Sequence, residues 1–195
     1  MSFKYSEDKD VIKKKDIYKY HKPENTNVVR KCKVSELDLN IVKPQRAGVI
    51  IYTKIDNEII FGLGVDTLSK EYTDFGGGIS YHKDKNVILG ALREFKEESL
   101  GIFGEVDFNH VLNSYVIYNN NNLIIFYYIN LNPTVINDVF LLNYNQTVKN
   151  NIVPEVCEIK WMNMTEFKKN IATRGKMFHR VQVFLQQSGE LLRMI

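Results

Sequence analysis

Two apolar runs separated by a polar turn open the patterned part of the chain. Residues 47–53 (AGVIIYT) form a continuous apolar run of strand length that is rich in β-branched side chains. The pair Asp56-Asn57 is a turn signal, and residues 58–65 (EIIFGLGV) predict the returning strand of a hairpin. Residues 86–100 instead repeat apolar side chains at spacings of three and four, which predicts a helix that stops at Gly101.

A second hairpin is predicted downstream. Residues 105–118 have the pattern of a long strand, the four-Asn segment 119–122 predicts a turn, and residues 123–130 (LIIFYYIN) predict the partner strand. Residues 155–162 (EVCEIKWM) predict one more strand. The segment 134–153 fits either a loop or a short helix, so both alternatives stay open here.

The ends of the chain have weaker patterns. Residues 1–27 are polar and Lys-rich and predict a partly helical or disordered extension. Residues 28–39 have room for one short strand. Near the other end, Thr165 is expected to cap a short helix to Ile171. A C-terminal helix is predicted over residues 176–194, with an apolar side made by Phe178, Val181, Leu185 and Leu192.

The order hairpin, helix, hairpin, strand, helix sets the fold class. Strands and helices do not alternate as they do in doubly wound parallel folds. We therefore expect an α+β protein with a mixed β-sheet sandwiched between helices. The division that we predict is a basic N-terminal extension over residues 1–44 and one domain, with its C-terminal helix, over residues 45–195.

Composition says more about the cellular compartment of the protein than about any reaction that it catalyses. The 195 residues include only two cysteines, and no apolar run has the length that spans a bilayer. We expect a protein of a reducing intracellular compartment, with neither a secretory leader nor a membrane partner. The oligomeric state cannot be deduced from these features.

Positive charge gathers toward both ends of the chain, although the net charge is only +3. Ten basic residues lie within the first 33 positions, namely Lys4, Lys9, Lys13, Lys14, Lys15, Lys19, Lys22, Arg30, Lys31 and Lys33. A second basic group consists of Lys168, Lys169, Arg174, Lys176 and Arg180. Basic ends around an acidic centre suit a polyanionic substrate, and the alternative is a solvated tail with one charged helix face.

The acidic centre is the stretch 76–101, which begins with three glycines and continues into the predicted helix. Glu94, Glu97 and Glu98 share one helix face at spacings i, i+3 and i+4, where like charges repel. A divalent cation over that face would remove the repulsion, and Mg²⁺ or Mn²⁺ prefers such oxygen ligands. The alternative is an ordinary exposed helix on which Arg93 pairs with Glu97.

These residues resemble the Nudix hydrolase family, whose box is written G-x5-E-x7-R-E-U-x-E-E-x-G-U. The run Arg93-Glu94-Phe95-Lys96-Glu97-Glu98 matches R-E-U-x-E-E, and Gly77 and Gly78 stand where the glycine pair of the family precedes the helix. The spacing departs from the family at two places. One extra residue follows Gly78, so Asp84 takes the place of the first Glu when counted from the glycine and Lys85 when counted from the arginine. Leu100 takes the later glycine position.

The resemblance implies a Nudix-like fold and a set of roles. Glu94, Glu97 and Glu98 would ligate Mg²⁺ or Mn²⁺, with a carbonyl of Gly78 or Gly77 completing the coordination. Arg93 would orient the glutamates, and the attacking water would cleave a pyrophosphate linkage. Glu155, six residues before Trp161, would be a supplementary ligand or the general base; its alternative is a surface acid after Pro154.

Substrate contacts are assigned more broadly. The candidates for base or phosphate contacts are Phe75 and Gly77, in and beside the glycine run, and Arg174 and Lys176, near the last helix. The substrates implied by the resemblance are nucleoside diphosphate derivatives, RNA caps and other polyphosphates such as diphosphoinositol polyphosphates, and the basic ends favour capped RNA among these. The alternatives are a non-catalytic Nudix-fold module that binds nucleotide or RNA, and an unrelated protein with a phosphate at a helix start. The shifted glycine and the run Glu97-Glu98-Ser99-Leu100-Gly101 resemble divergent family members of large DNA viruses, and the Asn- and Lys-rich composition fits an AT-rich genome.

Overall fold

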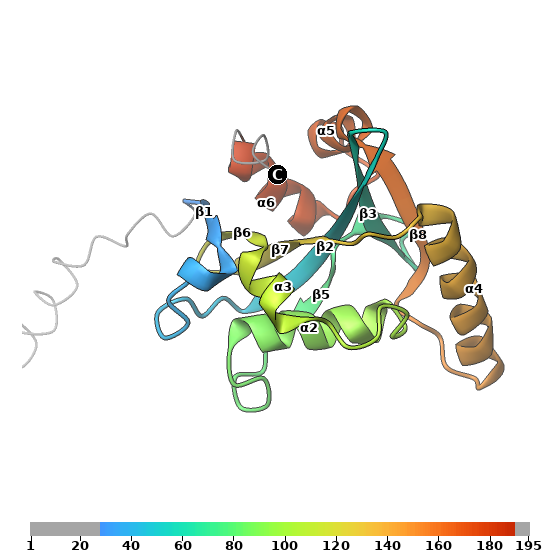
Figure 1. Cartoon of the computed structure of the whole chain (residues 1–195), viewed down its shortest axis with the longest axis horizontal. Coiled ribbons are helices and arrows are strands. Elements are labelled where there is room, and N and C mark those ends of the chain that lie inside the picture. Colours follow the sequence, from blue (N-terminus) through green and yellow to red (C-terminus); the bar gives the residue numbers. More distant parts are fainter. Residues whose placement is uncertain (1–27, 190–195) are drawn as a thin grey trace, which may run out of the picture.

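The computed structural model describes residues 28–189, which form a mixed eight-stranded sheet with helices on both faces (Figure 1). The predicted fold class is thus confirmed. Residues 1–27, for which we predict a partly helical or disordered extension, lie outside the described residues. None of the helices between residues 28 and 189 has the length and apolar character needed to cross a membrane.

The strands are β1 (Arg30–Lys33), β2 (Arg46–Ile55), β3 (Glu58–Asp66), β4 (Tyr72–Thr73), β5 (Phe75–Gly78), β6 (Tyr115–Tyr118), β7 (Asn122–Tyr128) and β8 (Val156–Asn163). The helices are the short 3₁₀ turn η1 (Val34–Glu36), α2 (Val87–Glu98), α3 (Phe108–Asn113), α4 (Pro133–Lys149), α5 (Met164–Ala172) and α6 (His179–Ser188). The sheet order is β1-β6-β7-β2-β3-β4, with β5 also pairing β2 and β8 also pairing β3. β2 and β7 run parallel, and the other paired strands run antiparallel.

The first predicted hairpin is confirmed as β2 and β3, joined at a turn where Asp56 and Asn57 both have positive φ. The central helix is confirmed as α2, which begins after Asn86. The Asn86 side chain accepts a hydrogen bond from the Leu89 amide at 3.0 Å, a standard N-terminal cap.

Residues 105–118 were predicted as one long strand, and this is wrong over its first part. The Asp107 side chain accepts a hydrogen bond from the Asn109 amide and starts α3, so only Tyr115–Tyr118 pairs with β7. For residues 134–153 the helical alternative holds. Asn132 caps α4 and Pro133 occupies its first turn, where a missing amide costs nothing.

Three further boundaries differ from the sequence predictions. The cap of α5 is Asn163 and not Thr165, because Asn163 accepts from the Glu166 amide. The last helix starts at His179, and Leu192, predicted for its apolar side, lies outside the described residues. The three glycines over residues 76–78, for which no strand is predicted, belong to β5 and pair with β2.

The sheet separates two apolar layers. Val49 and Ile51 of β2 face the layer that holds α2, whereas Ile50 faces the layer that holds α5 and α6. This alternation follows from the two-residue period of a strand. It places α2 directly over β2 and β5, on the lower side of the sheet in Figure 1.

The described part of the segment 1–44 takes part in this architecture. β1 pairs with β6 at the end of the sheet, and Val34 and Leu37 are buried in the α2-side layer. The boundary at residue 44 stays a prediction.

Candidate active site

Aromatic packing fixes the position of α2 on the sheet. Phe95 is fully buried and meets Phe75 of β5 edge-on, with ring centroids 5.6 Å apart. It also stacks on Phe103 at 5.0 Å. Because Phe95 is anchored in this way, the glutamates on either side of it, Glu94 and Glu98, are held at the main chain of β5.

The three glycines of β5 allow that close approach. A Cβ atom on Gly77 would lie 2.5 Å from a carboxylate oxygen of Glu94, and one on Gly76 would collide with the Gly48 main chain across the strand pair. The amide of Gly76 donates a hydrogen bond to Glu98 Oε2 at 2.8 Å. The glycines therefore serve to bring two carboxylates against a strand.

Arg93 is the centre of an ion-pair network at the start of this acidic face. Its guanidinium contacts Asp84 at 2.7 Å, Glu94 at 2.8 Å and Glu97 at 3.2 Å. It also donates to the carbonyl oxygen of Gly78 at 3.2 Å. Hydrogen bonding to Arg93 lowers the pKa of the Asp84 carboxyl, and the same bond raises the pKa of Arg93.

This network resolves the ambiguity in the sequence register. Asp84 is buried and paired with Arg93, so Asp84, and not Lys85, is the residue of this turn that contacts the arginine. Lys85 follows it with a φ of +58°, and Asn86 then caps α2. The extra residue in the glycine-to-arginine spacing is accommodated in this turn.

Glu98 is the most perturbed acid of the site. Burial is the main cause that raises the pKa of its carboxyl, and the nearby charges of Asp74 and Glu155 also raise it; with the opposing effects of the Gly76 hydrogen bond and Arg46 included, the pKa is about 9. A carboxyl in this environment is costly to ionise unless a positive charge approaches it.

A buried ion pair lies beside these acids. Arg46, the first residue of β2, binds Asp74 through two hydrogen bonds of 2.7 Å and donates a third to the carbonyl of Gly76 at 2.8 Å. Sequence reasoning missed both residues. The available signal was a charged residue directly before an apolar residue in two segments: Arg46 precedes the run 47–53, and Asp74 precedes Phe75.

The structure thus brings together Arg93, Glu94, Glu97, Glu98, Gly77 and Gly78 on α2 and β5. Glu155 is exposed, immediately before β8, and close enough for its charge to act on Glu98.

Three predicted substrate contacts lie apart from this cluster. Phe75 is a correction, because its side chain is fully buried in the core and cannot contact a substrate. Arg174 and Lys176 are exposed, in the segment between α5 and α6. That segment is joined to β4 through the main chain, where the Tyr72 amide donates to the Lys176 carbonyl at 2.7 Å.

The acids supply oxygen donors of the kind that a divalent cation binds, but they are not yet arranged as a complete set of ligands. Between residues 28 and 189, no three His, Cys, Asp or Glu side chains are already clustered as metal ligands. Glu94 and Glu97 are instead paired with Arg93. Half-buried Glu98 is repelled by the charges of Asp74 and Glu155, and a cation would offset that repulsion, since carboxylate oxygens suit Mg²⁺ or Mn²⁺.

Among solved structures, the chain is similar to several Nudix proteins. No family model matches the chain, and no curated protein does. An Ap4A hydrolase from C. elegans is 17% identical, with a TM-score of 0.42 over 75% of this chain and 96% of that one. The NUDIX domain of Shewanella oneidensis NrtR, complexed with ADP ribose, is 12% identical, with a TM-score of 0.43 over 82% and 96%.

A NUDIX family hydrolase from Clostridium perfringens is 16% identical, with a TM-score of 0.35 over 75% of this chain and 96% of that one. At such scores and identities these similarities carry no argument about activity. The functional conclusion rests on the residues of the site.

Proposed function

We propose that this chain is a metal-dependent, Nudix-type hydrolase that cleaves a pyrophosphate linkage in a nucleoside diphosphate derivative. Its reaction class is hydrolysis of phosphorus-containing acid anhydrides. The observation that carries the proposal is Glu98, a half-buried residue whose carboxyl is close to two other acids and on the same helix face as Glu94. Such an arrangement is explained by a cation that also binds phosphate oxygens.

Each residue of the site has a role in this proposal. Glu94, Glu97 and Glu98, with the Gly78 carbonyl, would hold Mg²⁺ or Mn²⁺. When bound, the ion supplies Lewis acidity and makes water more acidic. Arg93 holds the Glu94 and Glu97 carboxylates in place through its 2.8 Å and 3.2 Å contacts, and Asp84 fixes Arg93.

Glu155 is the proposed supplementary ligand or general base. As a base, its carboxylate takes the proton of the water whose oxygen attacks phosphorus. The bond between that phosphorus and the bridging oxygen breaks, and the leaving phosphate departs with the bond electrons. The proton then passes from Glu155 to solvent. Because Glu155 is exposed, this exchange needs no rearrangement of the fold.

Within this class the proposed substrate is capped RNA, which the protein would decap. The support is the basic character of residues 4–33 and 168–180, which suits a long polyanion. An origin in a large DNA virus, and a location in the host cytoplasm or the virion, stay predictions from the sequence resemblance.

The second candidate is a non-catalytic module that binds nucleotide or RNA on the same fold. One observation favours it: Arg93 already neutralises Glu94 and Glu97, as a structural ion pair would. The two candidates differ in whether divalent metal and an intact Glu98 are required.

The test is a substrate panel incubated with Mg²⁺ or Mn²⁺. The panel contains capped RNA, ADP-ribose, nucleotide sugars, NTPs, dinucleoside polyphosphates and diphosphoinositol phosphates. The reactions run in ¹⁸O-labelled water, and the products are then separated by chromatography. We expect cleavage that falls on the order of a hundredfold or more in Glu97→Gln and Glu98→Gln. Glu105→Gln, which alters an exposed acid paired with Lys96, is the control and should match wild type. RNA binding without any cleavage would favour the module.

A further inference from the structure

A second hollow lies away from the glutamates, at the far end of β2. Its volume is about 460 Å³, and its lining residues are Tyr52, Lys54, His110, Asn113, Ser114 and Tyr128. Tyr52 is six residues beyond Arg46 on the same strand, a separation of roughly 20 Å at about 3.3 Å per residue. Tyr52 also packs against the apolar layer of α5 and α6, whereas α2 packs on the opposite layer. The hollow is therefore separate from the candidate active site.

Aromatic rings dominate this hollow. Tyr52 and Tyr128 are register partners on the parallel strands β2 and β7, with ring centroids 5.5 Å apart. His110 of α3 lies 6.2 Å from Tyr128, at the point where β6 ends and leaves the edge of β7 uncovered. The Tyr rings and His110 are half-buried, so each shows part of its surface to solvent.

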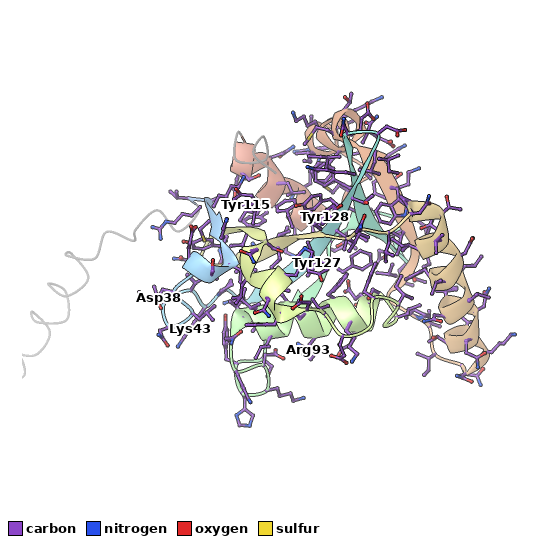
Figure 2. The ribbon with its side chains drawn as sticks, viewed as in Figure 1. Asp38, Lys43, Arg93, Tyr115, Tyr127 and Tyr128 are labelled. Carbon is purple, nitrogen blue, oxygen red and sulfur yellow. The ribbon has the colours of Figure 1, made fainter. Side chains whose placement is uncertain are left out.

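The aromatic surface continues along the same sheet face. Tyr115 of β6 is two residues from Ile117, and Tyr128 is two residues from Phe126; both neighbours face the α5 and α6 layer. Figure 2 labels Tyr115 and Tyr128 along β6 and β7. Burial raises the pKa of the Tyr52 phenol, and Tyr128 and Tyr115 add to this effect, which places the three phenols in one neighbourhood.

The charge of this region is positive. None of the six lining residues is acidic, and Lys54 is exposed at the rim, where it makes no ion pair with any residue from 28 to 189. Lys31 of β1 lies over the Tyr115 ring at 4.3 Å from its centroid. A ligand that matches both features carries flat aromatic rings on an anionic backbone.

We propose that the sheet face formed by Tyr52 and Tyr128, with Lys54 beside them, binds single-stranded RNA by stacking successive bases. Half-buried rings on a sheet face, with a basic residue beside them, are the chemistry by which proteins hold unpaired nucleotides. Two neighbouring rings suit successive bases of a strand better than a single nucleotide. Asn113 and Ser114 add amide and hydroxyl groups at the rim that can reach base edges.

This inference goes beyond the proposed hydrolysis, and its test needs no metal. The full chain is titrated into a labelled 12-nucleotide RNA with a 5′-hydroxyl end, in EDTA, and fluorescence anisotropy is measured. Tyr52→Leu and Tyr128→Leu keep apolar bulk but remove the rings, and each should weaken binding roughly 5- to 100-fold. Tyr128→Phe keeps the ring and should stay within about twofold of wild type.

Matched controls separate stacking from general effects. Tyr144→Leu removes a half-buried ring on α4, and Lys149→Gln removes a charge at the end of α4; both should bind like wild type. Lys54→Gln should weaken binding and reduce the salt dependence by about one ion. Melting temperatures of all variants verify folding. As a measurement on wild type, ultraviolet crosslinking should attach the RNA to peptides that contain Tyr52 or Tyr128.

Three results would overturn the proposal. The first is unchanged affinity in Tyr52→Leu/Tyr128→Leu, which would locate RNA binding elsewhere, for example in residues 1–27. The second is competition by AMP at the concentration at which the RNA binds, which would make a free nucleotide the ligand. The third is an absence of RNA binding by wild type. None of these results bears on metal-dependent cleavage.

Discussion

Among single residues, Gly77 shows most directly how backbone and acid are fitted together. Its position opposite the Glu94 carboxylate leaves no space for a methyl group. The group that would be displaced is the end of a flexible side chain, so the fold can absorb the change while the carboxylate cannot keep its place. Gly76, by contrast, faces the main chain of Gly48, which cannot move aside.

These two glycines should therefore respond differently to the same substitution. Gly77→Ala is expected to lower kcat on the order of 10- to 100-fold, because the Glu94 carboxylate is displaced. Its melting temperature should stay close to that of wild type. Gly76→Ala should instead lower the melting temperature strongly. Full activity in Gly77→Ala would show that the position of Glu94 does not matter for the reaction.

The pKa of Glu98 predicts how stability depends on pH in metal-free protein. The folded-state pKa of about 9 is above the ordinary value of 4.5, so between these values the folded state holds a proton that the unfolded state has lost. The free energy of unfolding should therefore fall as pH rises from about 4.5 to 9. Melting temperatures in EDTA at several pH values measure this.

Glu98→Gln should remove most of that dependence, because glutamine does not titrate. Glu105→Gln, at an exposed acid, is the control and should leave the pH dependence unchanged. A wild-type melting temperature that is flat or rises over this pH range would contradict the environment assigned to Glu98.

Sequence spacing was sufficient for some of these residues and not for others. The helical period alone puts Glu94, Glu97 and Glu98 on one face and Arg93 within reach of Glu97, and the structure has that arrangement. The helical period could not decide whether Asp84 or Lys85 contacts Arg93, because that depends on how the turn before the helix accommodates one extra residue. The Arg46–Asp74 pair joins residues 28 positions apart, and no local pattern encodes that contact.

Between elements, the Arg46–Asp74 ion pair fastens the start of β2 to the residue before β5. Asp74 is fully buried, and Arg46 is nearly so. Asp74→Ala or Arg46→Leu leaves the other charge buried without its partner, at a cost of roughly 3–5 kcal/mol in the free energy of unfolding. The double variant Arg46→Met/Asp74→Leu should lose much less. Urea denaturation measures all three, and a loss below about 1 kcal/mol in the single variants would contradict this role.

Sequence analysis missed α3 and β5 and left α4 open as a loop or a helix, and each case has a physical cause. α3 depends on one side-chain cap, Asp107, in a segment whose composition suits a strand. α4 buries only Ile136 and Phe140, while Val135, Leu141 and Leu142 are exposed, so its sequence has no clear apolar stripe. β5 contains three glycines and has no side-chain pattern; it is a strand because it pairs with β2.

For the whole molecule, the sheet separates two surfaces with different chemistry. The acids of α2, which packs on β5, belong to one layer, and the tyrosine face belongs to the other. The fold class was predictable because the order of apolar runs excludes a doubly wound sheet. The pairing of β1 with β6 was not, since it joins residues more than 80 positions apart.

Two truncations distinguish binding from folding at the N-terminal end. Removing residues 1–27 takes away seven lysines. It should therefore weaken the binding of a long RNA substrate, with little effect on the binding of ADP-ribose. Removing residues 1–44 also deletes β1, Val34 and Leu37, and it should lower the melting temperature as well. Activity assays and melting curves of both forms provide the comparison. Equal effects of the shorter truncation on both substrates would remove the reason for favouring RNA.

The most direct test of the central claim, that the acids of α2 hold a catalytic divalent cation, is a Mn²⁺ titration followed by electron paramagnetic resonance. Wild type should bind Mn²⁺ saturably, and Glu98→Gln should weaken that binding at least about tenfold. Glu105→Gln should bind as wild type does. If Glu98→Gln kept the wild-type affinity for Mn²⁺, or if wild type bound none, the assignment of these glutamates as a metal site would be wrong.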